Sequence, residues 1–129
     1  ITWLDWQHED EALQGYTRDL IRLRQEIKLL GDDVWWKQER VRWLNIQGEP
    51  MSELCWHNRG AKAMQIVLDD EWLLLINATR SQQIFNLPQG SWQISCVPSE
   101  KFNYNTDGKL TVEHMGIWIL QRKNTSLNI

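Results

Sequence analysis

Met64-Gln65-Ile66-Val67-Leu68 stands directly before Asp69-Asp70-Glu71, and Trp72-Leu73-Leu74-Leu75-Ile76-Asn77 follows. Both apolar runs have the length of strands, and the acidic residues between them favour a tight antiparallel hairpin. The second run is apolar at every position from 72 to 76, so it would present an apolar side chain to both faces of a sheet. We therefore predict a central strand that is covered on both sides.

Short strand-like segments recur on both sides of this hairpin. Alternation is clearest around Trp92, Ile94 and Cys96, which fall on one side of their segment. Residues 51–60 and 98–108 are polar or turn-rich and are predicted to be loops. Seven short strands at regular spacing predict a mainly β, antiparallel sandwich. The strands outside the hairpin are expected at residues 41–44, 83–87, 92–97, 110–114 and 116–121.

One long amphipathic helix is predicted ahead of the sandwich, from about residue 9 to residue 30. Apolar residues recur there at steps of three and four, which gathers them into one stripe. Gly31 is well placed to end the helix with a left-handed cap. An isolated helix of this length is marginal in water, so its stripe must pack against something. The stripe consists of Leu13, Tyr16, Leu20, Leu23, Ile27 and Leu30.

The composition excludes several classes of protein. The 129 residues carry 14 basic and 17 acidic side chains, a net charge of −3, which gives no basic surface for nucleic acid. The longest apolar run is residues 72–76, far short of the roughly 18–20 residues that cross a bilayer. We accordingly expect a cytoplasmic protein with no nucleic-acid or membrane partner. Cys55 and Cys96 are too few for a disulfide framework and are expected to be reduced, although one bridge between them is possible.

No catalytic or metal-binding constellation stands out. The three histidines, at positions 8, 57 and 114, lack metal-ligand spacing, and phosphate-binding, dinucleotide and nucleophile motifs are missing. The acidic residues fall at a predicted helix start and a predicted turn, where they have structural roles. We therefore expect no metal and no cofactor.

The chain contains nine tryptophans, and their positions suggest different roles. Four occupy strand positions and are expected in the sandwich core: Trp43, Trp72, Trp92 and Trp118. Trp35 and Trp36 follow the helix and could pack between two domains. Trp3 and Trp6 precede the helix, so a sandwich core does not explain them. With Asp5, they are the candidates for a substrate rim.

Several of these segments resemble one family. Trp3-Leu4-Asp5-Trp6 and Val41-Arg42-Trp43-Leu44-Asn45 are similar to the end of the catalytic barrel and the start of the C-terminal domain in bacterial glycogen debranching enzymes of the α-amylase superfamily, glycoside hydrolase family 13. Leu87-Pro88-Gln89-Gly90-Ser91-Trp92 resembles a turn of amylase C-terminal domains. The resemblance extends over nearly the whole chain and closes near Arg122.

The resemblance implies a multidomain cytoplasmic hydrolase that cleaves the α-1,6 branches of glycogen limit dextrins. Its (β/α)8 barrel would carry an Asp nucleophile, a Glu acid/base and a further Asp, all in a segment that precedes this sequence. Residues 1–37 would then be the last loop and eighth helix of the barrel with a connector, residues 38–122 the C-terminal sandwich of amylase type, and residues 123–129 a frayed tail. The chain alone would support the barrel and be inactive.

Two alternatives remain open from the residues themselves. A sandwich with exposed tryptophans could be a carbohydrate-binding module, because the rings can lie against the apolar faces of sugars. A helix with a strong apolar stripe could instead make the chain a protein-interaction domain. In an isolated chain, the stripe must fold onto the sandwich or self-associate through Leu13, Leu20, Leu23 and Ile27.

Overall fold

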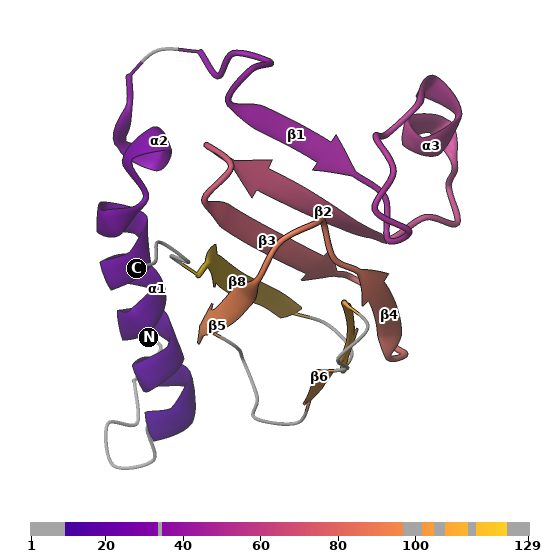
Figure 1. The fold of residues 1–129 in the computed structure, drawn as a ribbon. Coiled ribbons are helices and arrows are strands. Elements are labelled where there is room, and N and C mark those ends of the chain that lie inside the picture. Colours follow the sequence, from indigo (N-terminus) through magenta and orange to yellow (C-terminus); the bar gives the residue numbers. More distant parts are fainter. Residues whose placement is uncertain (1–9, 34, 97–101, 105–107, 114–115, 124–129) are drawn as a thin grey trace, which may run out of the picture.

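A computed structural model describes residues 10–33, 35–96, 102–104, 108–113 and 116–123. Two sheets pack face to face, and a long helix lies beside them (Figure 1). The elements in chain order are α1 (Glu11–Glu26), α2 (Lys28–Gly31), β1 (Val41–Leu44), α3 (Glu53–His57), β2 (Ala63–Leu68), β3 (Trp72–Asn77), β4 (Gln83–Asn86), β5 (Trp92–Cys96), β6 (Phe102–Tyr104), β7 (Lys109–Val112) and β8 (Gly116–Arg122).

Both sheets are antiparallel. The larger has the strand order β1-β2-β3-β8-β5, and the smaller has the order β4-β7-β6. Strand β3 is the middle strand of the larger sheet, and Leu73 and Leu75 on it are fully buried. The prediction of a central strand and the predicted fold class, an antiparallel β-sandwich preceded by a helix, are both confirmed.

The predicted hairpin between β2 and β3 is present. Asp69 and Asp70 have φ angles of 53° and 54°, the left-handed region that a primed turn requires of its central residues. The Glu71 N–H donates to the Leu68 carbonyl oxygen at 3.0 Å and closes the turn. Aspartate tolerates this conformation better than most residues, which explains why an acidic pair can serve where asparagine and glycine are usual.

The main core lies between the two sheets. Alternate residues of β3 and β8 point into it, with Leu75 paired to Trp118 across the two strands. Trp118 and Phe85 are its largest fully buried side chains. Trp92 closes one end of this core, and its indole N–H donates to the Pro88 carbonyl oxygen at 2.9 Å. Trp92 and Trp118 are therefore core residues, as predicted, and Trp72 is also buried, but in a second cluster on the other face of the larger sheet.

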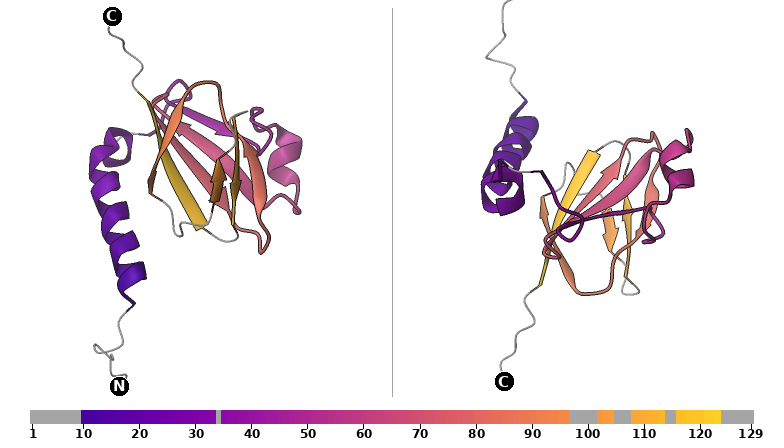
Figure 2. Two further views of the ribbon diagram at one scale, coloured as in Figure 1. Left: turned by 60° about the horizontal axis from the view of Figure 1, so that its bottom comes forward. Right: turned by 90° about the horizontal axis from the view of Figure 1, so that it is seen from above.

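Helix α1 docks on the outer face of the larger sheet, at the end opposite α3 (Figures 1 and 2). The Asp10 side chain caps it by accepting from the Leu13 N–H at 3.0 Å. Leu23 and Ile27 are buried against a second core cluster that includes Ile66, Trp72 and Ile119. The Tyr16 hydroxyl donates to the Ile117 carbonyl oxygen at 2.9 Å, which ties the helix to β8.

The predicted single helix is in fact interrupted. Ile27 has an extended backbone with ψ of 98°, and the short helix α2 follows it. Ile27 and Leu29 are both only 1% exposed. Residues two apart lie roughly 200° apart around an α-helix, so a continuous helix could not bury both. Breaking the helix at Ile27 turns both side chains toward the sheet.

Four further differences from the sequence prediction are local. Gly31 is not a left-handed cap: it ends α2 without a positive φ, and Asp32 is the C-cap with φ of −73°. Helix α3 forms within the predicted 51–60 loop because Ser52 caps it by accepting from the Cys55 N–H. Strand β6 forms within the predicted 98–108 loop and pairs with β7. Trp43 was predicted to be core, but it is 37% exposed because β1 is an edge strand and α1 covers a different part of that face. The expected tail at 124–129 lies outside the described residues.

Candidate functional site

The predicted substrate-rim residues Trp3, Asp5 and Trp6 lie outside the described residues, so that prediction stays open. Within the described ranges, no group of three His, Cys, Asp or Glu side chains could hold a metal ion. No helix in the described part of the chain is long and apolar enough to span a bilayer. The acidic residues there serve as caps, turns and ion-pair partners, as the next two clusters illustrate.

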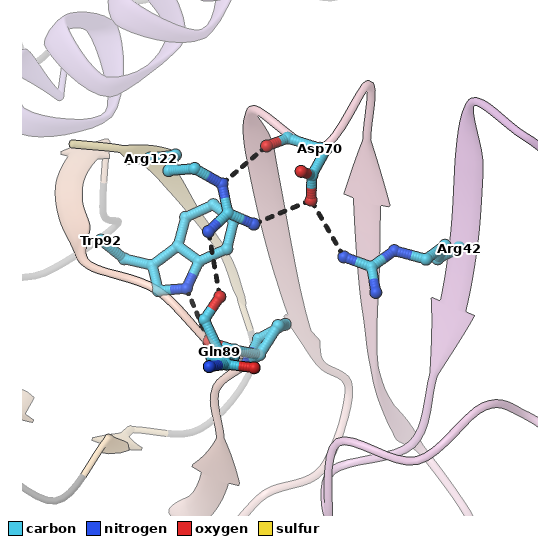
Figure 3. A network of polar contacts seen from close by, with 6 residues as sticks. Arg42, Asp70, Gln89, Trp92 and Arg122 are labelled. Atoms are coloured by element: carbon cyan, nitrogen blue, oxygen red, sulfur yellow. Dashed lines mark hydrogen bonds and ion pairs between the residues drawn. The ribbon is translucent and has the colours of Figure 1, made fainter. Parts of the chain in front are cut away.

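Arg122 at the end of β8 organises a polar network around the β2–β3 hairpin (Figure 3). Its guanidinium donates to the Asp70 carbonyl oxygen at 2.7 Å, to Asp70 Oδ1 at 2.8 Å and to the Gln89 carbonyl oxygen at 2.9 Å. It also stacks over the Trp92 ring at 4.3 Å from the centroid. Arg42 reaches the same Asp70 oxygen at 3.2 Å. Each of these contacts is made within the chain, so the network joins the β2–β3 turn to the turn at Gln89.

Arg40 forms a second cluster of ion pairs at the same end of the larger sheet. It donates to both Asp69 carboxylate oxygens at 2.7 Å and to Asp32 Oδ2 at 2.7 Å. The Arg40 guanidinium hydrogen-bonds the Asp69 carboxylate and holds its pKa below the usual range. This cluster joins the segment after α2 to the hairpin, which again is a structural role.

We expect Gly90→Ala to destabilise the domain through the Arg122 network. Gly90 has a φ of 128°, which an alanine adopts only with strain, and a Cβ there would overlap Arg122 Nη1. The strain alone costs about 1–3 kcal/mol. Urea unfolding followed by circular dichroism measures the change. Gly15→Ala in α1 is the matched control: its Cβ meets nothing within 4 Å, and it should stabilise by about 0.4–1 kcal/mol. Equal effects of the two substitutions would contradict this reading.

Three partly exposed tryptophans form a row at edge strand β1. The aromatic row consists of Trp36, Trp43 and Trp56, which are 43%, 37% and 52% exposed. The ring centroids of Trp36 and Trp43 lie 6.5 Å apart, and those of Trp43 and Trp56 lie 5.7 Å apart with an edge-to-face tilt of 65°. The Trp36 indole N–H donates to the Leu29 carbonyl oxygen at 3.3 Å. The row thus runs from α2 to α3.

The aromatic row continues into a furrow beside α3. The α3 furrow is made of two adjoining pockets, of about 260 Å³ and 250 Å³, that share Met51, Cys55 and residues 61–63. Its apolar half includes Trp56, Met64 and Ile76. Its polar half includes Asn45, Asn58, Lys62, Thr79 and Gln83. Amide side chains offer both donors and acceptors, so this half can hydrogen-bond a neutral polar ligand.

The two cysteines are free and belong to different parts of the domain. Cys55 lies in the furrow, where hydrogen bonds from Ser52 lower the pKa of its thiol. Cys96 is buried under α1, and burial raises the pKa of its thiol. These positions agree with the expectation of reduced thiols.

Helix α1 has a second apolar side that the sandwich does not cover. Leu13 and Ile21 are 59% and 57% exposed, and they line a shallow apolar groove with Gln14, Thr17 and Arg18. Of the residues predicted to mediate self-association, Leu23 and Ile27 are buried within the chain itself, Leu20 is partly buried against the same cluster, and Leu13 remains exposed. A contact with another protein segment could therefore use Leu13 and Ile21 without undocking the helix.

Comparisons with known proteins agree on one family. The family model described as the glycogen debranching enzyme C-terminal domain matches residues 37–114. The chain is 50% identical over 93 residues to a glycogen operon protein GlgX homolog of Haemophilus influenzae. It is 44% identical over 95 residues to glycogen debranching enzymes of Yersinia pseudotuberculosis and Yersinia pestis. Each match covers 72% of this chain and 14% of the relative.

Proposed function

The chain belongs to the glycogen debranching enzyme C-terminal domain family, and from this premise we propose that it serves a cytoplasmic hydrolase that cleaves α-1,6 branches of glycogen limit dextrins. Its role is to support the catalytic domain, and the described residues carry none of the chemistry. The domain limits that we propose are 1–37 for the end of the barrel with a connector, and 38–122 for the sandwich.

The observation that carries this proposal is the two-sided helix α1. One side, with Leu23 and Ile27, is buried against the sandwich. The other side exposes Leu13 and Ile21 over a shallow groove. A second partner on this side is favoured because full burial of an exposed large apolar side chain is worth roughly 1.5–3 kcal/mol, and Leu13 and Ile21 would each gain about half of that. A barrel that packs on the second side would make α1 the shared element between the two domains.

Catalysis by such an enzyme would come from carboxylates outside the described residues. Retaining glycosidases need two carboxyl groups about 5–5.5 Å apart, one ionised and one protonated. The carboxylates of Asp10, Asp69 and Asp70 are instead held by a helix N-terminus and by arginines. We therefore expect the chain alone to be inactive on branched glucans.

A domain exchange tests this function. The chimera is the Haemophilus influenzae homologue in which this chain replaces the corresponding C-terminal region. We expect the chimera to release linear oligosaccharides from a branched limit dextrin, and the isolated chain to release none, as followed by reducing-sugar assay and chromatography. Debranching by the isolated chain, or a folded chimera without activity, would contradict the proposal.

A further inference from the structure

We propose that the aromatic row and the α3 furrow together bind a linear stretch of α-1,4-linked glucan, at a site separate from any catalytic centre. The choice of glucan rests on the proposed function. The presence of a site for a neutral polyhydroxylated chain rests on the geometry alone: three partly exposed tryptophans lead into a furrow whose far half is lined by amide groups.

The tryptophans supply the apolar half of such a site. A glucose ring has apolar C–H faces that pack on an indole, while its hydroxyl groups point outward to polar partners. Trp36, Trp43 and Trp56 remain 37–52% exposed although each has an aromatic neighbour, so ring surface is available to a ligand. The ring planes turn by 36° from Trp36 to Trp43 and by 65° from Trp43 to Trp56. The three rings are therefore not coplanar, and a ligand would contact them at different angles.

The polar half of the furrow fits hydroxyl groups rather than ions. Asn58 accepts from the Gly60 N–H through Oδ1, and Gln83 donates to Thr79 through Nε2. The Asn58 Nδ2 donor and the Gln83 Oε1 acceptor are therefore the amide groups that can face a ligand. Lys62 is the charged residue among the side chains that line these two pockets. Ligand sites of this kind combine a mainly apolar surface with a few convergent polar groups. With no carboxylate in the lining, cation binding is disfavoured, and a neutral ligand that both donates and accepts hydrogen bonds is favoured.

A protein segment is the competing occupant of this surface. The core of a protein interface is apolar with a polar rim around it. Here the polar groups are gathered at one end instead, and the tryptophans lie in a row that leads toward them. Helix α1, whose exposed side we assign to the barrel, lies at the other end of the molecule from α3 (Figures 1 and 2). The two surfaces can therefore be occupied at the same time.

Titration of the full chain with maltoheptaose tests the inference, with intrinsic tryptophan fluorescence and isothermal calorimetry as readouts. We expect saturable binding that Trp43→Ala and Trp56→Ala each weaken by about tenfold or more, as loss of a central aromatic contact does. Trp56→Phe keeps an aromatic ring at this position and should retain most of the affinity. Retained binding in this variant would show that position 56 can be substituted without unfolding the site. Trp35→Ala is the matched control, because Trp35 lies in the same connector as Trp36 but is 92% exposed and outside the row.

Three outcomes would overturn the inference: no binding by the folded chain, equal binding by the wild type and Trp56→Ala, or loss of binding in Trp35→Ala alone. If the chain fails to bind and the surface is instead protected in the chimera, a protein segment is the occupant. An active chimera without glucan binding by the chain rejects this inference only. Glucan binding with an inactive, folded chimera rejects the proposed function only.

Discussion

Replacing Trp118 with alanine is expected to lower the free energy of unfolding by about 3–5 kcal/mol, the largest effect of any single substitution considered for this domain. Trp118 is fully buried between the two sheets and faces Leu75 across β3 and β8. Its removal leaves a cavity that backbone strands on both sides cannot collapse to fill. Because a small domain has only about 5–15 kcal/mol of total stability, the variant should lose a large fraction of it.

The variant Trp118→Phe distinguishes two contributions to stability, the packing of the large ring and the cost of burying its indole N–H. The Trp118 indole N–H is buried and finds no hydrogen-bond partner among the described residues. An unpaired buried donor carries a desolvation cost that phenylalanine avoids. The phenylalanine variant should therefore lose less stability than volume alone implies. Urea denaturation with far-ultraviolet circular dichroism measures both variants, and similar losses for alanine and phenylalanine would contradict the core assignment.

The second large effect is expected from the double variant Leu23→Ala, Ile27→Ala. Both side chains are buried against the outer face of the larger sheet. Truncation of a fully buried Leu or Ile costs about 2–5 kcal/mol. A helix of this length is only marginally stable by itself, so it depends on these contacts to stay folded and docked. We expect α1 and α2 to detach while the sandwich stays folded. Hydrogen exchange should then show fast exchange of amides 11–31 and slow exchange in β3 and β8.

Leu13→Ala, Ile21→Ala is the matched control on the other side of the helix. These residues are exposed, so their truncation should leave α1 docked and its amides protected. Sedimentation of the two double variants also tests self-association. The variant with a detached helix exposes the rest of the stripe and the apolar sheet face that the helix covers, with Ile66, Trp72 and Ile119, and should associate more than the control. Unchanged protection of α1 in the Leu23 and Ile27 variant would show that its burial does not hold the helix in place.

The fold was most predictable from the sequence where the hydrophobic pattern of a segment matches its burial in the folded domain. Residues 72–76 are apolar at every position, and that alone places β3 between two covering layers. The break at Ile27 could not be predicted, because it satisfies two contacts with a sheet that forms later in the chain. Trp43 lies on a strand with a suitable pattern, but the pattern does not reveal which part of a face a helix will cover.

The candidate site was less predictable than the fold. Trp36, Trp43 and Trp56 come from a connector, an edge strand and a short helix, and only the fold makes them a row. The five-residue helix α3 is too short for periodicity to reveal, and the one available signal was Ser52 as an N-cap three residues before Cys55. The polar half of the furrow joins residues 45 and 83, which are remote in sequence.

The claim that α1 joins the two domains is tested most directly in the chimera that carries both Leu13→Asp and Ile21→Asp. Its debranching rate and its thermal midpoint are the two quantities to measure. If the exposed side of α1 packs on the catalytic domain, two carboxylates there would be buried without partners, so both debranching rate and thermal midpoint should fall. Arg22→Gln, at an exposed position of α1 that does not line the groove with Leu13 and Ile21, should leave both unchanged. Wild-type activity and stability in the Leu13 and Ile21 variant would contradict the claim that α1 joins the two domains.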